Sequence, residues 1–312
     1  MTIGLICCWF HNPSILTDHH KSLEYVFRRQ LIGWREYIDE ITFVDSNWGL
    51  DLASYDTAIL KRPGNSHWAG MKEVSERSTS DVLLFVDQDM LIYDPEIIKQ
   101  MKWEIEENKA DVCSILDSSG KVQLFTQNEF RRSRARLCPY LCMIKRNLVS
   151  EIGYDFDPDP DHDTMGKMTE KLLSLHPDLH ILEIPDDRFS VYLRNGEIVA
   201  NTNLDGRGFS WSEPEDKETN RGYYHIRNAT LGIEMIEEYF SNEDSYRNRK
   251  AMSPDWEVFR AMSWWYIFDQ IEGNYAGLQR IQTVVNDFGV SKELWNTYIN
   301  TIREKQTWVS HL

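Results

Sequence analysis

Short apolar segments alternate with segments of helical periodicity over roughly the first 110 residues, and this alternation restricts the chain to few folds. Strand–helix alternation with short connections favours right-handed crossovers and a mostly parallel sheet that helices cover on both faces. We therefore expect an α/β fold with a Rossmann-like nucleotide-binding sheet. The expected strands are 3–8, 41–45, 57–60 and 81–89, and the expected helices are about 14–34, 66–79 and 96–108.

The remaining two thirds of the chain are less regular. We expect a hairpin around the turn 117–120, strands at 140–144 and 179–184, a helix at about 164–174, and a loop-rich stretch over 185–228. Asp94 is the expected N-cap of the helix that runs to about Asn108, with Pro95 at its first helical position. From Leu231 onward the pattern is helical and rich in aromatic residues; Trp264 and Trp265 suit either a core or an acceptor platform.

The domain prediction follows from this change of pattern. A catalytic domain is expected over 1–228, with a nucleotide-sugar half at about 1–110 and an acceptor half at about 111–228. A helical region over 229–312 is expected to follow it and to influence acceptor choice or self-association as a homo-oligomer.

Charge and cysteine content exclude several classes of protein. The net charge of −16 argues against a general nucleic-acid coat or an anionic-membrane binder, because both need a broad positive field. No apolar run approaches the roughly 18 residues that span a bilayer, and the N-terminus resembles a first strand more than a signal peptide. The five cysteines include no CxxC pair, so we expect a soluble, cytoplasmic protein without a disulfide scaffold.

Asp87-Gln88-Asp89 is the strongest chemical signal in the sequence. Two carboxylates at the end of a buried strand repel one another, and a divalent cation with oxygen ligands, Mg²⁺ or Mn²⁺, relieves that repulsion. Such a cation also binds substrate phosphates. The alternative is that one Asp caps the next turn while the other faces water. The strand-end position favours the metal site, with Asp87 and Asp89 as ligands.

The order of these motifs resembles the GT-A glycosyltransferases, nucleotide-sugar-dependent enzymes, and particularly their family-2-like members. The resemblance covers roughly residues 3–175 and rests on ITFVDSN, on the segment Arg62–Ala69 before the metal strand, and on VLLFVDQDM. It implies that Asp45 lies near the nucleotide base, that Arg62 and Asn65 lie near the phosphates, and that Asp87 contacts the donor through the metal.

The resemblance also implies a general base. Asp161-His162-Asp163 matches the acidic pair that the family carries at a helix start beside the acceptor. By that match Asp163 is the base, with Asp161 as the second candidate, although His162 stands where the family usually has Glu. If configuration is retained instead of inverted, Asp163 only positions the acceptor. The alternative is that Asp163 is simply an N-cap.

Two further segments carry candidate ligands. Many GT-A enzymes take a third metal ligand from a C-terminal histidine, which here is His225, unless that residue is structural. Arg227 either neutralises the diphosphate or is a surface charge. The cluster Arg131, Arg132, Arg134 and Arg136 suits the diphosphate or an anionic acceptor, or else a solvated loop that balances nearby acids.

The resulting hypothesis is a metal-dependent glycosyltransferase that moves a sugar from a nucleotide-diphosphate donor to an acceptor hydroxyl, with inversion by an Asp base. The alternatives are a non-catalytic nucleotide-sugar or carbohydrate-binding protein on the same fold, and a nucleotidyltransferase. The acceptor stays open among carbohydrate, protein, small molecule and modified DNA base.

Overall fold

The computed structural model describes most of the chain, which forms two compact units. Unit 1 comprises Met1–Pro13, Gly33–Asp186 and Arg207–Tyr223, and unit 2 comprises Ser14–Ile32, Asp187–Gly206 and Tyr224–Leu312. The domain boundary expected at residue 228 stays a prediction. The described residues are 1–10, 18–46, 48–50, 58–62, 64, 67–92, 95–117, 136–159, 164–184, 190–194, 197–201, 223–226, 229–252 and 255–305.

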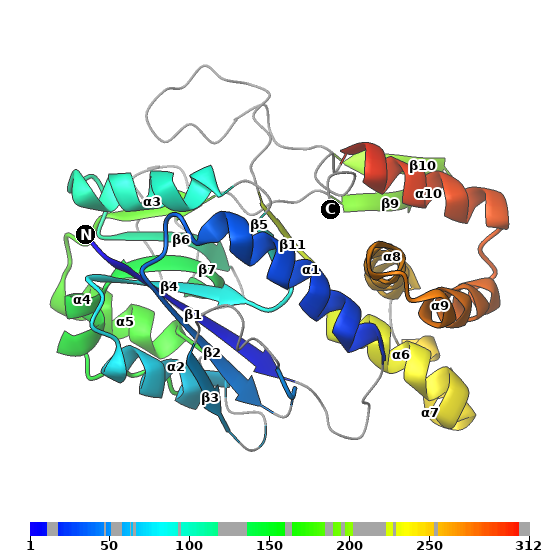
Figure 1. Cartoon of the computed structure of the whole chain (residues 1–312), viewed down its shortest axis with the longest axis horizontal. Coiled ribbons are helices and arrows are strands. Elements are labelled where there is room, and N and C mark those ends of the chain that lie inside the picture. Colours follow the sequence, from blue (N-terminus) through cyan, green and yellow to red (C-terminus); the bar gives the residue numbers. More distant parts are fainter. Residues whose placement is uncertain are drawn as a thin grey trace. The chain divides into compact units, whose positions relative to one another are not determined.

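Unit 1 contains a seven-stranded sheet in the order β3-β2-β1-β4-β7-β6-β8 (Figure 1). Only β7 runs antiparallel to its neighbours β4 and β6; the other adjacent pairs in this sheet are parallel. The α/β, mostly parallel prediction is therefore confirmed. The strands are β1 Ile3–Phe10, β2 Glu40–Ser46, β3 Ala58–Lys61, β4 Val82–Asp87, β6 Val112–Asp117, β7 Arg136–Lys145 and β8 Ile181–Ile184, and the short β5 is Met90–Ile92.

Helices cover both faces of this sheet, as expected for buried parallel strands. Helices α2, α4 and α5 contribute to one core together with strand residues such as Ile6, Val44 and Phe85. Helix α3 packs against β6 and β7 on the opposite face (Figure 1). The helices are α2 His67–Arg77, α3 Glu96–Glu106, α4 Arg146–Glu151 and α5 Gly166–Leu175.

Several local predictions in unit 1 need correction. Pro95 occupies the N-cap position of α3 and not its first turn, and Asp94 lies outside the described residues. Strand β6 pairs with β7 and β8, while the expected hairpin partner at 121–125 is also outside them. The start of helix α5 also differs from the expected one. The helix begins at Gly166, with Met165 at its N-cap in a left-handed conformation (φ 68°). The N-cap of α5 is therefore Met165 and not the expected Asp163, which itself lies outside the described residues.

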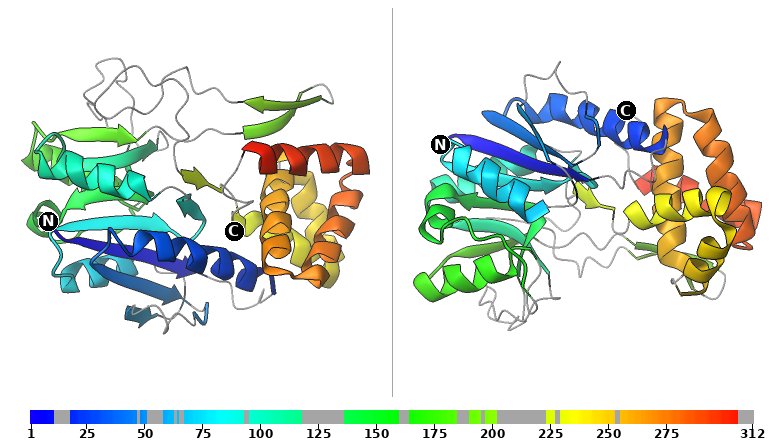
Figure 2. Two further views of the ribbon diagram at one scale, coloured as in Figure 1. Left: turned by 45° about the horizontal axis from the view of Figure 1, so that its top comes forward. Right: turned by 90° about the horizontal axis from the view of Figure 1, so that it is seen from below.

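Unit 2 is mostly helical, and the helices expected after Leu231 are confirmed. Trp264 and Trp265 are buried in its core, which decides between the two interpretations of this pair. The loop-rich prediction for 185–228 is wrong for 190–194 and 197–201, where β9 and β10 form an antiparallel pair beside α10 (Figures 1 and 2). Its elements are β9 Ser190–Arg194, β10 Glu197–Asn201, α6 Ala229–Ser241, α7 Glu243–Met252, α8 Asp255–Glu272, α9 Tyr275–Asp287 and α10 Lys292–Lys305. Most of α1 Asp18–Trp34 and of β11 Tyr223–His225 also belongs to it, while Gly33, Trp34 and Tyr223 belong to unit 1.

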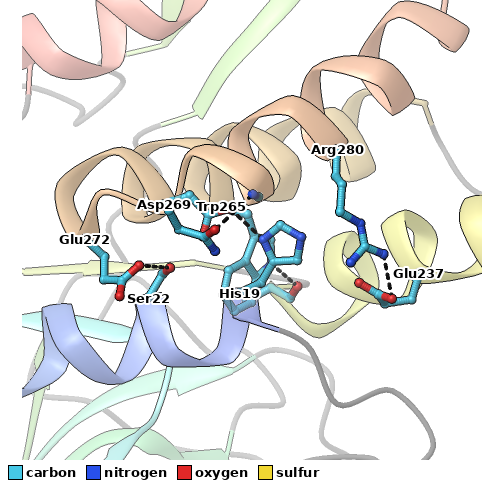
Figure 3. A network of polar contacts seen from close by, with 10 residues as sticks. His19, Ser22, Glu237, Trp265, Asp269, Glu272 and Arg280 are labelled. Carbon is cyan, nitrogen blue, oxygen red and sulfur yellow. Dashed lines mark hydrogen bonds and ion pairs between the residues drawn. The ribbon is translucent and has the colours of Figure 1, made fainter.

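A buried polar pair joins α1 to α8 within unit 2 (Figure 3). His19 Nδ1 lies 2.6 Å from Asp269 Oδ2, and the two side chains are 1% and 0% exposed. A Cβ on Gly277 would lie 2.0 Å from the same Asp269 oxygen, so only glycine fits at the start of α9. Trp265 Nε1 also donates to the Ala229 carbonyl at 2.8 Å, which ties α8 to α6. Across the part of the chain that the structure describes, no helix is both long and apolar enough to cross a bilayer.

Replacing Asp269 by Ala should lower the free energy of unfolding by about 2–4 kcal/mol, because it leaves a buried imidazole without its partner. Urea denaturation followed by tryptophan fluorescence measures the change. The control is Lys21→Ala, which removes the exposed pair with Asp18 and should cost less than about 1 kcal/mol. Equal losses in the two variants would contradict a special role for the buried pair.

Candidate functional site

The carboxyl ends of β1, β2 and β4 meet at one edge of the sheet in unit 1. In the parallel register, Cys8 of β1 is opposite Asp87, and Trp9 is opposite Asp45. The chain runs from β1 to β2 and β3 on one side, and later returns to β4 on the other side. Ligands of open α/β sheets bind beyond the carboxyl ends of the strands at such a switch point. Asp45 and Asp87 thus lie at the edge where a ligand is expected.

The turn after β4 is anchored by its middle residue, Gln88. Its side-chain oxygen accepts from the Phe10 backbone N–H at 2.9 Å, and its amide nitrogen donates to the Phe10 carbonyl at 3.4 Å. This pair of contacts joins the turn to the end of β1. Asp87 and Asp89, on either side of Gln88, are both partly exposed. Their carboxylates are therefore accessible from the edge of the sheet while their backbone is fixed.

His67, the first residue of α2, contacts the first of these carboxylates. Its Nε2 lies 3.3 Å from Asp87 Oδ1, and the side chains are 28% and 25% exposed. Partial burial alone would lower the pKa of His67. The electrostatic interaction with Cys8 and the hydrogen bond to Asp87 outweigh that effect and raise the pKa well above its usual value. Asp87 therefore has an imidazole as its neighbour at the start of α2.

Close packing fixes the start of α2 against the strands. The Cys8 thiol donates to the His67 carbonyl at 3.8 Å, a long contact even for sulfur. One turn further, a Cβ on Gly70 would approach Val44 Cγ1 to 2.5 Å, so the helix lies closer to β2 than any larger residue would allow. The expected helix start before the metal strand is present, although Asn65 itself lies outside the described residues.

Arg62 follows β3 and is bound to α2. Its backbone N–H donates to the Asp45 carbonyl at 2.9 Å. Its guanidinium forms an ion pair with Glu73 and a 3.5 Å contact with the Ala69 carbonyl, while Nε is buried with no partner among the described residues. The side chain therefore lies along the helix whose start faces Asp87. Its predicted contact with donor phosphates stays a prediction.

Asp45 is almost fully buried, with 3% of its surface exposed. Its Oδ1 accepts from the Trp48 N–H at 2.6 Å, its Oδ2 accepts from the Leu50 N–H at 2.9 Å, and the Gly49 N–H lies 3.1 Å from both oxygens. Trp48 in turn packs edge-on against Trp9, with ring centroids 4.7 Å apart. The carboxylate thus holds the turn that follows β2.

Most of the other predicted site residues lie outside the part of the chain that the structure describes. Asp161, Asp163 and Arg227 lie outside the described residues, as do Arg131, Arg132 and Arg134, and only the backbone of His225 is described, in β11. Arg136 is 5% exposed and donates to the Thr164 carbonyl, so this member of the arginine cluster is not a solvated loop residue. In the described part of the chain, no cluster of three or more His, Cys, Asp or Glu side chains could hold a metal.

Three residues with contacts at this edge of the sheet, Cys8, His67 and Gln88, were not predicted from the sequence. The middle position of an Asp-x-Asp motif gives no local signal of its role, and the contact of His67 depends on how α2 packs. The position of Cys8 beside Asp87 needs only the assumption that β1 and β4 are parallel neighbours in register. Because the sequence pattern predicts both strands, this contact follows once the two strands are assumed to pair.

Comparisons with known proteins give a likeness of fold alone. No protein-family model matches the chain, and no curated protein sequence matches it. Among solved structures, a Bacillus anthracis protein described as a glucose-1-phosphate thymidylyltransferase is 12% identical to this chain, with a TM-score of 0.41. The match covers 59% of this chain and 87% of that one. Glucosyl-3-phosphoglycerate synthase of Mycobacterium tuberculosis, in complex with Mn²⁺ and UDP-glucose, is 13% identical with a TM-score of 0.40, covering 59% and 68%.

A third similar structure is the 4-diphosphocytidyl-2C-methyl-D-erythritol synthase of Anaerococcus prevotii, which is 14% identical with a TM-score of 0.38 over 59% of this chain and 88% of that one. The similar structures thus include a glycosyltransferase and nucleotidyltransferases. At such low identities and TM-scores they carry no argument about what this chain does.

Replacing Asp45 by Asn should destabilise unit 1 by about 1–3 kcal/mol, because an amide group would face backbone donors that now meet a carboxylate oxygen. Urea denaturation measures the loss, and quenching of tryptophan fluorescence by acrylamide reports whether Trp48 leaves Trp9. Asp178→Asn, at an exposed turn on the opposite edge of the sheet, is the control. An Asp45 variant as stable as this control would show that the carboxylate does not hold the turn.

Proposed function

We propose that this protein is a metal-dependent glycosyltransferase that moves a sugar from a nucleotide-diphosphate donor to an acceptor hydroxyl. The observation that carries the proposal is the position of Asp87 and Asp89. Asp87 ends β4, whose preceding residues are all buried, and Asp89 lies two residues further on. Both are partly exposed, and β4 flanks the switch point of the sheet. A nucleotide-diphosphate is the class of ligand that combines this position in the fold with a need for carboxylate-bound metal.

The described residues fit a divalent cation such as Mn²⁺ or Mg²⁺. Carboxylate oxygens are the hard ligands that both ions prefer, and Mg²⁺ usually takes only one or two carboxylates, with waters and substrate phosphates completing its shell. Asp87 and Asp89 would supply those carboxylates, and His225 is our candidate for a third ligand. When bound, the cation offsets the negative charge that develops on the diphosphate leaving group.

The chain's own residues would bind the donor and move the proton. Asp45, through the turn that it holds, lies on the nucleotide-base side, while Arg62, Asn65 and Arg227 serve the phosphates. By the resemblance to GT-A enzymes, Asp163 takes the proton from the acceptor hydroxyl as it attacks the anomeric carbon, with Asp161 as the second candidate. That attack inverts the configuration. In a retaining enzyme, Asp163 positions the acceptor only.

The acceptor side of the proposal is broader. Carbohydrate, protein, small molecule and modified DNA base all offer a hydroxyl, and the net charge of −16 disfavours DNA. We place the reaction in a reducing compartment, the cytoplasm, because the five cysteines, all within the described residues, form no disulfide. Self-association as a homo-oligomer stays part of the proposal.

The test is incubation of the purified protein with UDP-, GDP- and CDP-sugars, with and without Mn²⁺, followed by measurement of nucleoside diphosphate release. We expect release from one donor class that disappears with EDTA. Asp89→Ala should reduce the rate about 100-fold or more, because it removes a ligand that supports charge stabilisation in the transition state.

Asp178→Ala, a matched exposed carboxylate on the opposite edge of the sheet, should keep the wild-type rate. Release of pyrophosphate from nucleoside triphosphates, without diphosphate release from sugars, would instead identify a nucleotidyltransferase. Donor binding without turnover, unaffected by Asp89→Ala, would identify a binding protein. Either result would overturn the glycosyltransferase proposal.

A further inference from the structure

We propose that His67 is a positioning residue that orients the Asp87 carboxylate toward the divalent cation of the donor site. The inference rests on the proposed function and adds to it a residue that neither the sequence motifs nor the comparisons indicate. It concerns three elements of unit 1: β1, α2 and β4.

The geometry places one Asp87 oxygen beside the His67 imidazole. His67 Nε2 lies 3.3 Å from Oδ1, and since a carboxylate only accepts, the imidazole nitrogen must donate. A carboxylate that is held by one oxygen in this way presents its other oxygen in a defined direction. This is the arrangement that outer partners impose on metal-binding carboxylates, which are themselves usually hydrogen-bonded.

Both ends of the contact are fixed by packing. On the helix side, Gly70 lies against Val44 too closely for any side chain, and the Cys8 thiol contacts the carbonyl of His67 itself. On the strand side, the two contacts of Gln88 with Phe10 hold the residue that follows Asp87. The backbone segments that carry the two side chains are therefore held in place relative to one another. A rigid partner restricts a ligand more than a mobile one does, which supports an orienting role.

Electrostatics allows the opposite outcome, and this makes the proposal testable. A donor beside Asp87 stabilises the carboxylate in the orientation that it contacts, but a positive charge there also opposes an incoming cation. If orientation dominates, removal of His67 weakens cation binding. If repulsion dominates, removal strengthens it. Loss of an outer partner typically costs 10–100-fold in metal affinity.

The experiment titrates the full-length protein with Mn²⁺ alone and measures unbound Mn²⁺ by electron paramagnetic resonance, so it needs no donor, acceptor or turnover. We expect His67→Leu to raise the dissociation constant for Mn²⁺ about 10–100-fold. His67→Gln places an amide nitrogen near the position of Nε2 and should restore affinity to within about threefold of wild type. His67→Asn, whose amide is too short to reach, should behave like His67→Leu and replaces it if that variant does not fold.

The chain offers a closely matched control in the same unit. His176 Nε2 lies 2.8 Å from Glu151 Oε2, with side chains 33% and 47% exposed, away from the carboxyl edge of the sheet. His176→Leu therefore removes a histidine–carboxylate pair of similar exposure and should leave Mn²⁺ affinity unchanged. A purely structural effect of losing such a pair would weaken binding equally in both leucine variants.

The variant Asp89→Asn distinguishes failure of the cation site from failure of the role proposed for His67. If wild type binds Mn²⁺ and Asp89→Asn does not, but His67→Leu binds as well as or better than wild type, then the role of His67 is refuted while the proposed function stands. Equal losses in His67→Leu and His176→Leu also refute it. If wild type binds no Mn²⁺, or Asp89→Asn binds as tightly as wild type, the cation site itself fails and the proposed function fails with it.

Discussion

The pairing of β4 with β1 is the interaction on which the candidate site depends. Residues Val82–Val86 are all buried, because β4 lies between β1 and β7 and helices cover both faces of the sheet. A carboxylate inside such a strand would be very costly, so the first position that can accommodate one is the point at which the strand becomes partly exposed. Asp87 occupies that point, and its register with Cys8 places it beside the switch point of the sheet.

Asp87 and Asp89 bring two acidic side chains to this edge of the sheet. Asp87 and Asp89 are two residues apart and share a partly exposed turn, so their mutual repulsion opposes folding unless cations offset it. His67 contacts Asp87, and Arg62 is paired with Glu73. The described residues thus bring two carboxylates and one histidine to the carboxyl edge. Unit 2 shows the contrasting case, since its buried Asp269 has an immediate histidine partner.

The sequence predicted those parts of the fold that depend on local pattern. Strands β1, β2 and β4 and helix α2 were found because apolar runs and helical periodicity are local properties, and strand ends placed Asp45 and Asp87 at one edge. Pairing is not local: nothing near Gln88 indicates that it contacts Phe10, 78 residues away. Strands β9 and β10 were missed because five-residue strands between loops carry little periodicity. The base, Asp163, rests on resemblance alone.

Asp45 and Asp87 show why position in a strand does not by itself assign a role. Both are aspartates at the carboxyl ends of strands that flank β1. Asp45 is 3% exposed and accepts hydrogen bonds from three backbone N–H groups, so its charge is already compensated by the turn that it holds. Asp87 is 25% exposed and contacts a side chain whose removal leaves the backbone intact. A carboxylate that backbone donors compensate in this way stabilises the turn that carries it, whereas a partly exposed carboxylate beside a side chain depends less on its own turn. The two aspartates therefore differ in their hydrogen-bond donors, which are backbone N–H groups for Asp45 and a histidine side chain for Asp87, and not in their position at a strand end.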